Sequence, residues 1–319
     1  LLFIHIGTHK TGTSAIQRFF MSNRNALRSR GVHYVETGLR ESDFAHYDLA
    51  RSVSQGPSSD LWTKLREEVC AAPDVIHVIS CEAFWKGDPR AVRQCCEGIG
   101  SIKILAYLRR QDNFFESLYK HHIKLGGWMS FDEFVGKRTK AGDYLAVLEK
   151  WDKSFGHDRL VVRHYDTAEG SINIVDDVVR TLGLEPDSSL IRPPRTNSSP
   201  RAELLPVLRA LHKLDSSGAK GLFEKLRQRN LDYARTGDFL TYSQRVAIME
   251  HFADSNRKIS ARYTGSPFPA LTDSPRDIWS TESEEHYRLL VDVFDVAGRL
   301  RSRRARIRKR VRADNPPGS

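Results

Sequence analysis

The feature that most constrains the fold is the start of the chain, where an apolar run leads into a loop bounded by glycines. Residues 1–17 read LLFIHIGTHKTGTSAIQ. The apolar run predicts a buried strand. Apolar residues then recur with helical spacing and predict an amphipathic helix after the loop, namely Ile16, Phe19, Phe20 and Leu27. A strand, a glycine loop and a helix in this order are the context of a phosphate-binding loop.

The loop keeps the glycine spacing of a Walker A motif but not its lysine. A Walker A loop runs glycine, four residues, glycine, lysine and then serine or threonine. Here Gly7 and Gly12 have that spacing, whereas Thr13 stands at the lysine position and Lys10 lies inside the loop. We therefore expect Lys10 to reach the 5′ end of a bound nucleotide from a different side. The plain alternative is an ordinary polar turn between a strand and a helix.

A second block, from Ile104 to Lys124, combines an arginine and a serine at a defined spacing. It reads ILAYLRRQDNFFESLYKHHIK, which predicts a strand ending at Leu108, then Arg109, and a helix that carries Ser117. Arginine can bind a phosphate dianion through two parallel donors, and a serine in the first turns of a helix adds a hydroxyl near the positive end of the helix dipole. The two residues together predict a second phosphate site.

These two blocks, in this order, resemble the sulfotransferases that use 3′-phosphoadenosine 5′-phosphosulfate (PAPS), in particular bacterial members related to the carbohydrate sulfotransferases. The resemblance covers roughly residues 1–200 and implies PAPS as donor and adenosine 3′,5′-bisphosphate (PAP) as product. It also implies which residues bind the nucleotide. The 5′-phosphosulfate would be held by the first loop, through Gly7, Lys10, Thr11, Gly12, Thr13 and Ser14. The 3′-phosphate would be held by Arg109 and Ser117, with Arg195, Asn197 and Ser198 as candidates from a late loop that folds over the nucleotide.

The resemblance also implies a base for the acceptor hydroxyl. Glu82 follows the predicted strand VIHVIS, at the strand end where open α/β sheets place their ligands, and carbohydrate-type members often use such a glutamate. His46 is the rival candidate. Lys10 would stabilise the leaving phosphate, and we expect in-line transfer without a metal because the strand ends offer no obvious aspartate for Mg²⁺. A carbohydrate is the expected acceptor.

The remaining pattern predicts one α/β architecture. Apolar runs at 75–80, 104–108 and 160–165 alternate with helical periodicity, which is typical of a parallel sheet with helices on both faces. We predict a three-layer α/β/α core of the P-loop type over residues 1–200. A mainly helical extension would follow at 201–300, and a basic, disordered tail at 301–319.

Charge and cysteine content limit the partners and the compartment. Eight of the basic residues that give the formal net charge of +10 lie in the run RSRRARIRKRVR near the C-terminus. Solvation explains such a run, and an anionic partner such as nucleic acid or a membrane surface is the alternative. No apolar run approaches the roughly 20 residues of a membrane span. Four cysteines without metal-ligand spacing favour a reducing, cytoplasmic location.

Two other functions stay open at this point. A P-loop kinase would use the same fold with Mg²⁺ and ATP, and Glu82 could then serve as its metal ligand; the missing Walker lysine argues against it. A non-catalytic nucleotide-binding or nucleic-acid-binding protein would keep the loop and act through the basic tail. Metal dependence separates the first alternative from a sulfotransferase, and deletion of residues 301–319 separates the second.

Overall fold

In a computed structural model of the chain, the structure describes residues 1–40, 42, 44–167, 170–194, 200, 202, 204–214 and 239–271. They fall into two compact units. The first unit takes in the described residues of 1–114, 139–194 and 247–271, and the second those of 115–138, 200–214 and 239–246. Each unit is described separately below.

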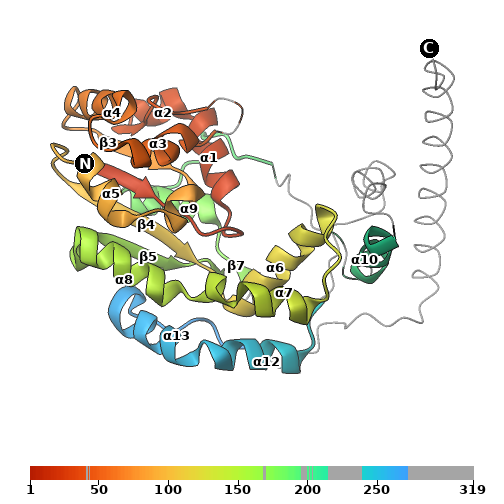
Figure 1. The fold of residues 1–319 in the computed structure, drawn as a ribbon. Helices are drawn as coiled ribbons and strands as arrows, with labels where there is room; N and C mark the ends of the chain where they lie inside the picture. Colours follow the sequence, from red (N-terminus) through yellow and green to blue (C-terminus); the bar gives the residue numbers. More distant parts are fainter. Residues whose placement is uncertain are drawn as a thin grey trace, which may run out of the picture. The chain divides into compact units, whose positions relative to one another are not determined.

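The first unit is built on a five-stranded parallel sheet (Figure 1). Its strands are β1 (Leu2–His5), β2 (Val32–Tyr34), β3 (Ile76–Ser80), β4 (Ile102–Leu108) and β5 (Leu160–His164), in the order β2-β3-β1-β4-β5. All four pairings are parallel, and Phe3 of β1 aligns with Val78 of β3 and with Lys103 of β4. The predicted α/β class with a central parallel sheet is confirmed.

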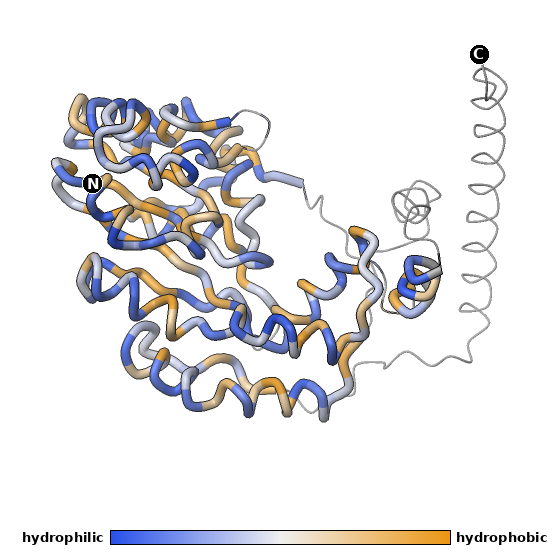
Figure 2. The backbone as a smooth tube through the Cα atoms, viewed as in Figure 1, coloured by the Kyte–Doolittle hydropathy of each residue, from blue (hydrophilic) through white to orange (hydrophobic). Residues whose placement is uncertain are grey.

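One face of the sheet is covered by α1 (Thr13–Ser22), α2 (Arg24–Arg28) and α9 (Ile174–Thr181). Alternate strand residues point to this side, among them Phe3, Val78 and Tyr107, and pack in one cluster with Phe20 of α1 and Val178 of α9. Figure 2 shows hydrophobic segments along the strands and alternating hydrophobic and hydrophilic residues in the helices. This layer therefore holds the helix that follows the glycine loop firmly against the sheet.

The other layer contains α4 (Asp60–Cys70), α5 (Pro89–Cys95) and α8 (Tyr144–Phe155). In α8 four residues with helical spacing are all buried, namely Tyr144, Leu148, Trp151 and Phe155. The shorter elements of the first unit are α3 (Tyr47–Ser52), η1 (Val53–Gln55), η2 (Glu82–Lys86), η3 (Thr139–Gly142), η4 (His157–Arg159), α13 (Ala253–Ile259), a π-turn η5 (Ser260–Thr264), and the antiparallel pair β6 (Asp166–Thr167) and β7 (Gly170–Ser171).

Several helices begin at side-chain caps. Ser130 and Glu133 form a capping box at the start of α7 (Phe131–Arg138), since each side chain accepts a hydrogen bond from the other's backbone N–H. Asn173, and not the nearby Ser171, caps α9 by accepting from the backbone N–H of Asp176, because Ser171 is still part of β7.

The second unit contains most of α6 (Gln111–Lys124), together with α7, α10 (Leu204–Leu214) and the first residues of α12 (Tyr242–His251). The Tyr119 ring contacts the rings of Phe131, Phe134 and Phe239. Lys120 is buried and pairs with Glu116 at 2.6 Å. Arg245 pairs with the same carboxylate.

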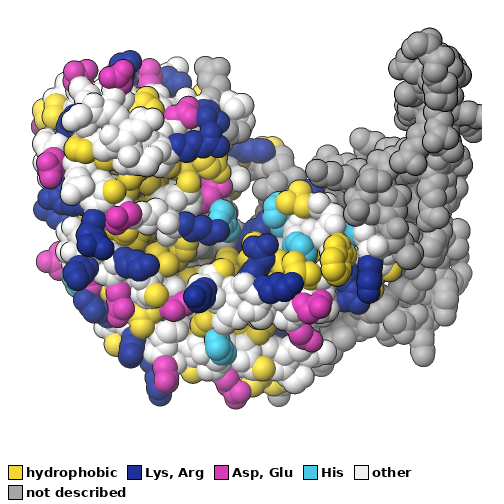
Figure 3. All heavy atoms as spheres, in the orientation of Figure 1, with side chains coloured by type: hydrophobic (Ala, Val, Ile, Leu, Met, Phe, Trp, Pro, Cys, Tyr) yellow, Lys and Arg dark blue, Asp and Glu magenta, His cyan; other side chains and the backbone are white. Residues whose placement is uncertain are grey.

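Within 201–300 the described residues include α10, α12, α13 and η5, while residues 301–319 lie outside the described residues. The proposed domain boundaries stay a prediction. On the face drawn in Figure 3, the Lys and Arg side chains of the described chain are interspersed with Asp and Glu. Among the described helices, none has both the length and the apolar character that crossing a bilayer requires.

Phe20→Ala should destabilise the first unit strongly. Phe20 is fully buried and stacks on Tyr34 with ring centroids 5.1 Å apart, so truncation leaves a cavity beneath the sheet. We expect the free energy of unfolding to fall by about 3–5 kcal/mol in urea titration. Ile191→Ala is the matched control, because Ile191 is 60% exposed and its loss should cost under about 0.5 kcal/mol. Equal effects of the two substitutions would contradict this packing.

Candidate functional site

The glycine loop turns through three left-handed residues between β1 and α1. Gly7 has φ 61°, Lys10 has φ 69° and Gly12, the residue before α1, has φ 78°. A Cβ on Gly7 would lie 3.1 Å from Thr13 Oγ1 and 3.3 Å from Glu82 Cβ. Glycine at this position therefore lets the loop lie directly against Glu82. Successive N–H groups in turns of this kind can converge on an anion.

Two of the predicted hydroxyl ligands are used inside the loop. Thr11 Oγ1 and Thr13 Oγ1 both donate to the carbonyl oxygen of Thr8, at 2.8 and 3.3 Å. Thr8 Oγ1 in turn donates to the carbonyl oxygen of Tyr107 at 3.0 Å, which ties the loop to β4. Thr11 and Thr13 are buried, whereas Ser14 is exposed. In this structure Thr11 and Thr13 shape the loop, and Ser14 is the hydroxyl that faces solvent.

Glu82 lies beside the loop with both carboxylate oxygens hydrogen-bonded. Tyr47 Oη, from the first turn of α3, donates to Oε1 at 2.6 Å. Gln17 Nε2, from α1, lies 3.3 Å from Oε2 and donates also to Ser80 Oγ at 3.3 Å. His5 Nδ1 is 2.8 Å from the same serine oxygen. The carboxylate is thus held from two helices at the carboxyl end of β3, next to the loop.

His46 is enclosed by backbone groups. It is fully buried, its Nδ1 accepts from the Ser80 N–H at 3.1 Å, and its Nε2 lies 2.9 Å from the carbonyl oxygen of Val35. Burial lowers the pKa of His46 to about 4. Both ring nitrogens are engaged in holding the chain before α3, so the geometry favours Glu82 over His46 as a base.

Stability should depend on pH through His46 and His5. Burial lowers the pKa of each to about 4, below the unfolded value of 6.5. The unfolded chain therefore binds more protons below pH 6.5, and stability should fall as the pH drops from 6.5 to 4. We expect the free energy of unfolding to be about 2 kcal/mol per histidine lower at pH 5 than at pH 7.

Urea titrations at the two pH values measure this loss. His46→Gln should reduce the difference between them, while His251→Gln, at an exposed position, should leave it unchanged. A wild-type stability that is flat between pH 7 and pH 5 would show that neither buried histidine stays neutral in the fold.

Arg109 connects the end of β4 to the loop. Its Nη1 donates to the carbonyl oxygen of Lys10 at 2.9 Å, and its Nε lies 3.7 Å from Asp166 Oδ1. Nε is buried and makes no hydrogen bond. Asp166 also accepts from the Arg110 backbone N–H at 2.5 Å and from Asn113 Nδ2 at 3.0 Å. Burial raises the pKa of Asp166 despite the neighbouring Arg109.

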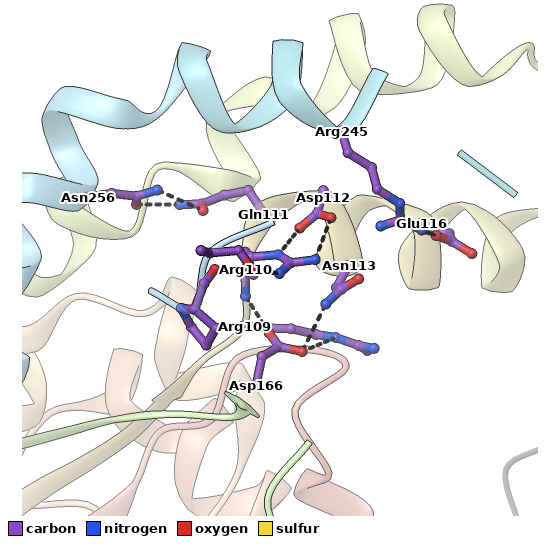
Figure 4. Close-up of polar contacts among 11 residues, drawn as sticks. Arg109, Arg110, Gln111, Asp112, Asn113, Glu116, Asp166, Arg245 and Asn256 are labelled. Carbon is purple, nitrogen blue, oxygen red and sulfur yellow. Dashed lines mark hydrogen bonds and ion pairs between the residues drawn. The ribbon is translucent and has the colours of Figure 1, made fainter. Parts of the chain in front are cut away.

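The residues after Arg109 are structural. Arg110 donates to both oxygens of Asp112, at 2.7 and 3.0 Å, and Gln111 exchanges two amide hydrogen bonds with Asn256 at 2.7 and 3.0 Å (Figure 4). These contacts fasten the first turn of α6 to the segment around α13. They hold the backbone from which Arg109 projects.

Other predicted residues are not brought into this arrangement. Ser117 is on α6 within the second unit, so its pairing with Arg109 stays a prediction. Arg195, Asn197 and Ser198 lie outside the described residues. Within the part of the chain that the structure describes, no three His, Cys, Asp or Glu residues form a group that could hold a metal ion.

Sequence reasoning missed Gln17, Tyr47 and Asp166. Gln17 follows Thr13 by four residues, so helical spacing could have placed it on the side of α1 that faces Glu82. Asp166 lies just past β5, and the rule that ligand groups gather at the carboxyl ends of parallel strands could have found it. The position of Asp166 corrects the statement in the sequence analysis that the strand ends offer no obvious aspartate. Nothing in the sequence singles out Tyr47.

Comparisons with known proteins do not assign this chain to a family. No family model matches the chain. An uncharacterized protein from Archaeoglobus fulgidus is 26% identical over 217 residues, which cover 61% of this chain and 58% of that protein. The chain therefore spans less than two thirds of that relative's length.

One solved structure, the crystal structure of a sulfotransferase from Alicyclobacillus acidocaldarius, aligns with 73% of this chain and 98% of its own. The sequence identity is 18% and the TM-score is 0.38. At these values the similarity supports no argument about what the chain does. The functional argument therefore depends on the residues of the site.

Proposed function

We propose that the protein is a PAPS-dependent sulfotransferase that transfers a sulfuryl group to an acceptor hydroxyl on a carbohydrate. The observation that carries the proposal is the convergence of three groups at neighbouring strand ends. The loop follows β1, Glu82 follows β3 and Arg109 follows β4, and these strands are adjacent in the order β3-β1-β4. Gly7 lies against Glu82, and Arg109 donates to Lys10 in the same loop.

The residues suit a nucleotide with phosphates at both ends of the ribose. The left-handed turns of the loop and the Lys10 ammonium would hold the 5′-phosphosulfate. Arg109, whose side chain stays 23% exposed, would bind the 3′-phosphate. Ser14 would add a hydroxyl, while Ser117, Arg195, Asn197 and Ser198 stay candidates from the sequence for the 3′-phosphate.

In the proposed reaction the new bond forms between the acceptor oxygen and sulfur, and the bond between sulfur and the 5′-phosphate oxygen breaks. Glu82 takes the proton of the acceptor hydroxyl. Lys10 balances the negative charge that collects on the departing 5′-phosphate. The carbohydrate acceptor follows from the resemblance of Glu82 to the glutamate of carbohydrate-type enzymes, and the transfer needs no metal.

A transfer assay tests this proposal. The purified protein is incubated in EDTA with PAPS carrying ³⁵S and with a panel of sulfated and unsulfated oligosaccharides, and radioactivity bound to the sugars is measured. We expect transfer to at least one member of the panel, unaffected by EDTA. Phosphoryl transfer from ATP, present only with Mg²⁺, would instead establish the kinase alternative.

The proposed location of the protein is the cytoplasm.

A further inference from the structure

Arg109 already has a hydrogen-bond partner in the glycine loop, which the proposed function makes the 5′-phosphate loop. Its Nη1 donates to the carbonyl oxygen of Lys10 at 2.9 Å. Lys10 is one of two non-glycine residues with positive φ among those described, at 69°. An L-residue rarely adopts this conformation unless surrounding contacts impose it. The hydrogen bond from Arg109 is such a contact, because it fixes the orientation of the peptide that follows Lys10.

Tyr165 links Arg109 to the other end of the loop. The Arg109 guanidinium carbon lies 5.4 Å from the centroid of the Tyr165 ring. A Cβ on Gly12 would lie 3.3 Å from Cε2 of the same ring and 3.1 Å from Cγ2 of Ile174. The ring is therefore in contact with both Arg109 and the glycine that opens α1. Asp166, the next residue, lies 3.7 Å from Arg109 Nε (Figure 4).

We propose that Arg109, supported by Tyr165, is a positioning residue for the 5′-phosphate loop in addition to being the 3′-phosphate ligand. This inference rests on the proposed function and extends it. If Arg109 served the 3′-phosphate alone, its loss would not affect a nucleotide that lacks this phosphate. If it also holds the Lys10 peptide, its loss weakens binding of every nucleotide that uses the loop.

The test compares two nucleotides that differ only in the 3′-phosphate. Binding of PAP and of adenosine 5′-monophosphate is measured by calorimetry in EDTA for the wild type, Arg109→Ala and Arg109→Lys. We expect Arg109→Ala to lower the affinity for the monophosphate at least tenfold, and the affinity for PAP by a larger factor. Arg93→Ala is the matched control, since Arg93 also lies over a ring, that of Phe155 at 5.9 Å, on α5. It should change neither affinity by more than twofold.

Arg109→Lys separates the hydrogen bond from the charge. Lysine keeps the positive charge but lacks the planar fork that reaches the Lys10 carbonyl while lying over a ring. We expect Arg109→Lys to lower the affinity for the monophosphate nearly as much as Arg109→Ala does. Monophosphate affinity restored to the wild-type value in Arg109→Lys would mean that charge alone acts, and would overturn the inference.

Tyr165 variants supply a second measurement that leaves Arg109 intact. Tyr165→Phe keeps the ring, so its affinity for both nucleotides should stay within twofold of wild type. Tyr165→Leu removes the ring and should lower the affinity for the monophosphate several-fold. Thermal unfolding of each variant without nucleotide measures any loss of stability, since Tyr165 also packs against the hydrophobic cluster of the core.

The outcomes distinguish this inference from the function beneath it. An unchanged monophosphate affinity in Arg109→Ala, with PAP weakened, overturns the positioning role and leaves the sulfotransferase site in place. Wild-type protein that binds neither nucleotide overturns the proposed function, and the inference with it.

Discussion

Glu82→Gln is expected to lower kcat by about 10²–10⁴-fold, the usual contribution of a positioned general base. Glutamine has the shape of glutamate and can keep its place beside Tyr47 and Gln17, whose side chains lie 2.6 and 3.3 Å from the carboxylate oxygens. It cannot take up the proton of the acceptor hydroxyl. The kinetics are measured with the acceptor that the transfer assay identifies.

The controls for Glu82 separate chemistry from binding. PAP affinity should stay within about threefold of wild type in Glu82→Gln, since the residue is proposed to act on the acceptor side. Glu97→Gln, at an exposed position after α5, should leave kcat unchanged. A Glu82→Gln enzyme with wild-type kcat would remove Glu82 from the mechanism.

Lys10→Met is expected to lower kcat/KM by about 10²–10³-fold, the range found when one charge-stabilising group is lost from a site. Methionine keeps an unbranched stem but no charge, so the loss reports the ammonium. Its backbone carbonyl remains available to Arg109, which limits the damage to the loop. Steady-state kinetics on the same acceptor give the measurement.

Lys86→Met is the matched control for Lys10. Lys86 is exposed on η2, four residues after Glu82. Burial of His9 is the main cause of its lowered pKa, and the nearby charge of Lys86 is the second. Its loss should change kcat/KM by less than about threefold. Similar losses in the two variants would mean that any positive charge near the loop suffices, and that Lys10 has no specific role.

The sheet was predictable because four of its five strands coincide with apolar runs of the sequence. The runs at 75–80, 104–108 and 160–165 correspond closely to β3, β4 and β5. β2 was missed because three residues, Val32–Tyr34, carry no periodic signal. Its place at the sheet edge depends on pairing with β3, a long-range contact that no local pattern specifies.

From the sequence, candidate site residues can be identified only at the end of each predicted strand, one strand at a time. Gly7, Lys10, Glu82 and Arg109 each stand just after an apolar run, and parallel topology then gathers strand ends at one edge. Partners such as Tyr47 and Gln17 reach Glu82 across separations of 35 and 65 residues. The internal hydrogen bonds of Thr11 and Thr13 depend on the left-handed turns of the loop, which side-chain patterns do not reveal.

Calorimetric titration of the purified protein with PAP in EDTA, beside ATP with and without Mg²⁺, tests the central claim most directly. We predict micromolar binding of PAP without metal and no tighter binding of Mg²⁺-ATP. Binding of Mg²⁺-ATP together with no binding of PAP would contradict the sulfotransferase site and assign the loop to a kinase.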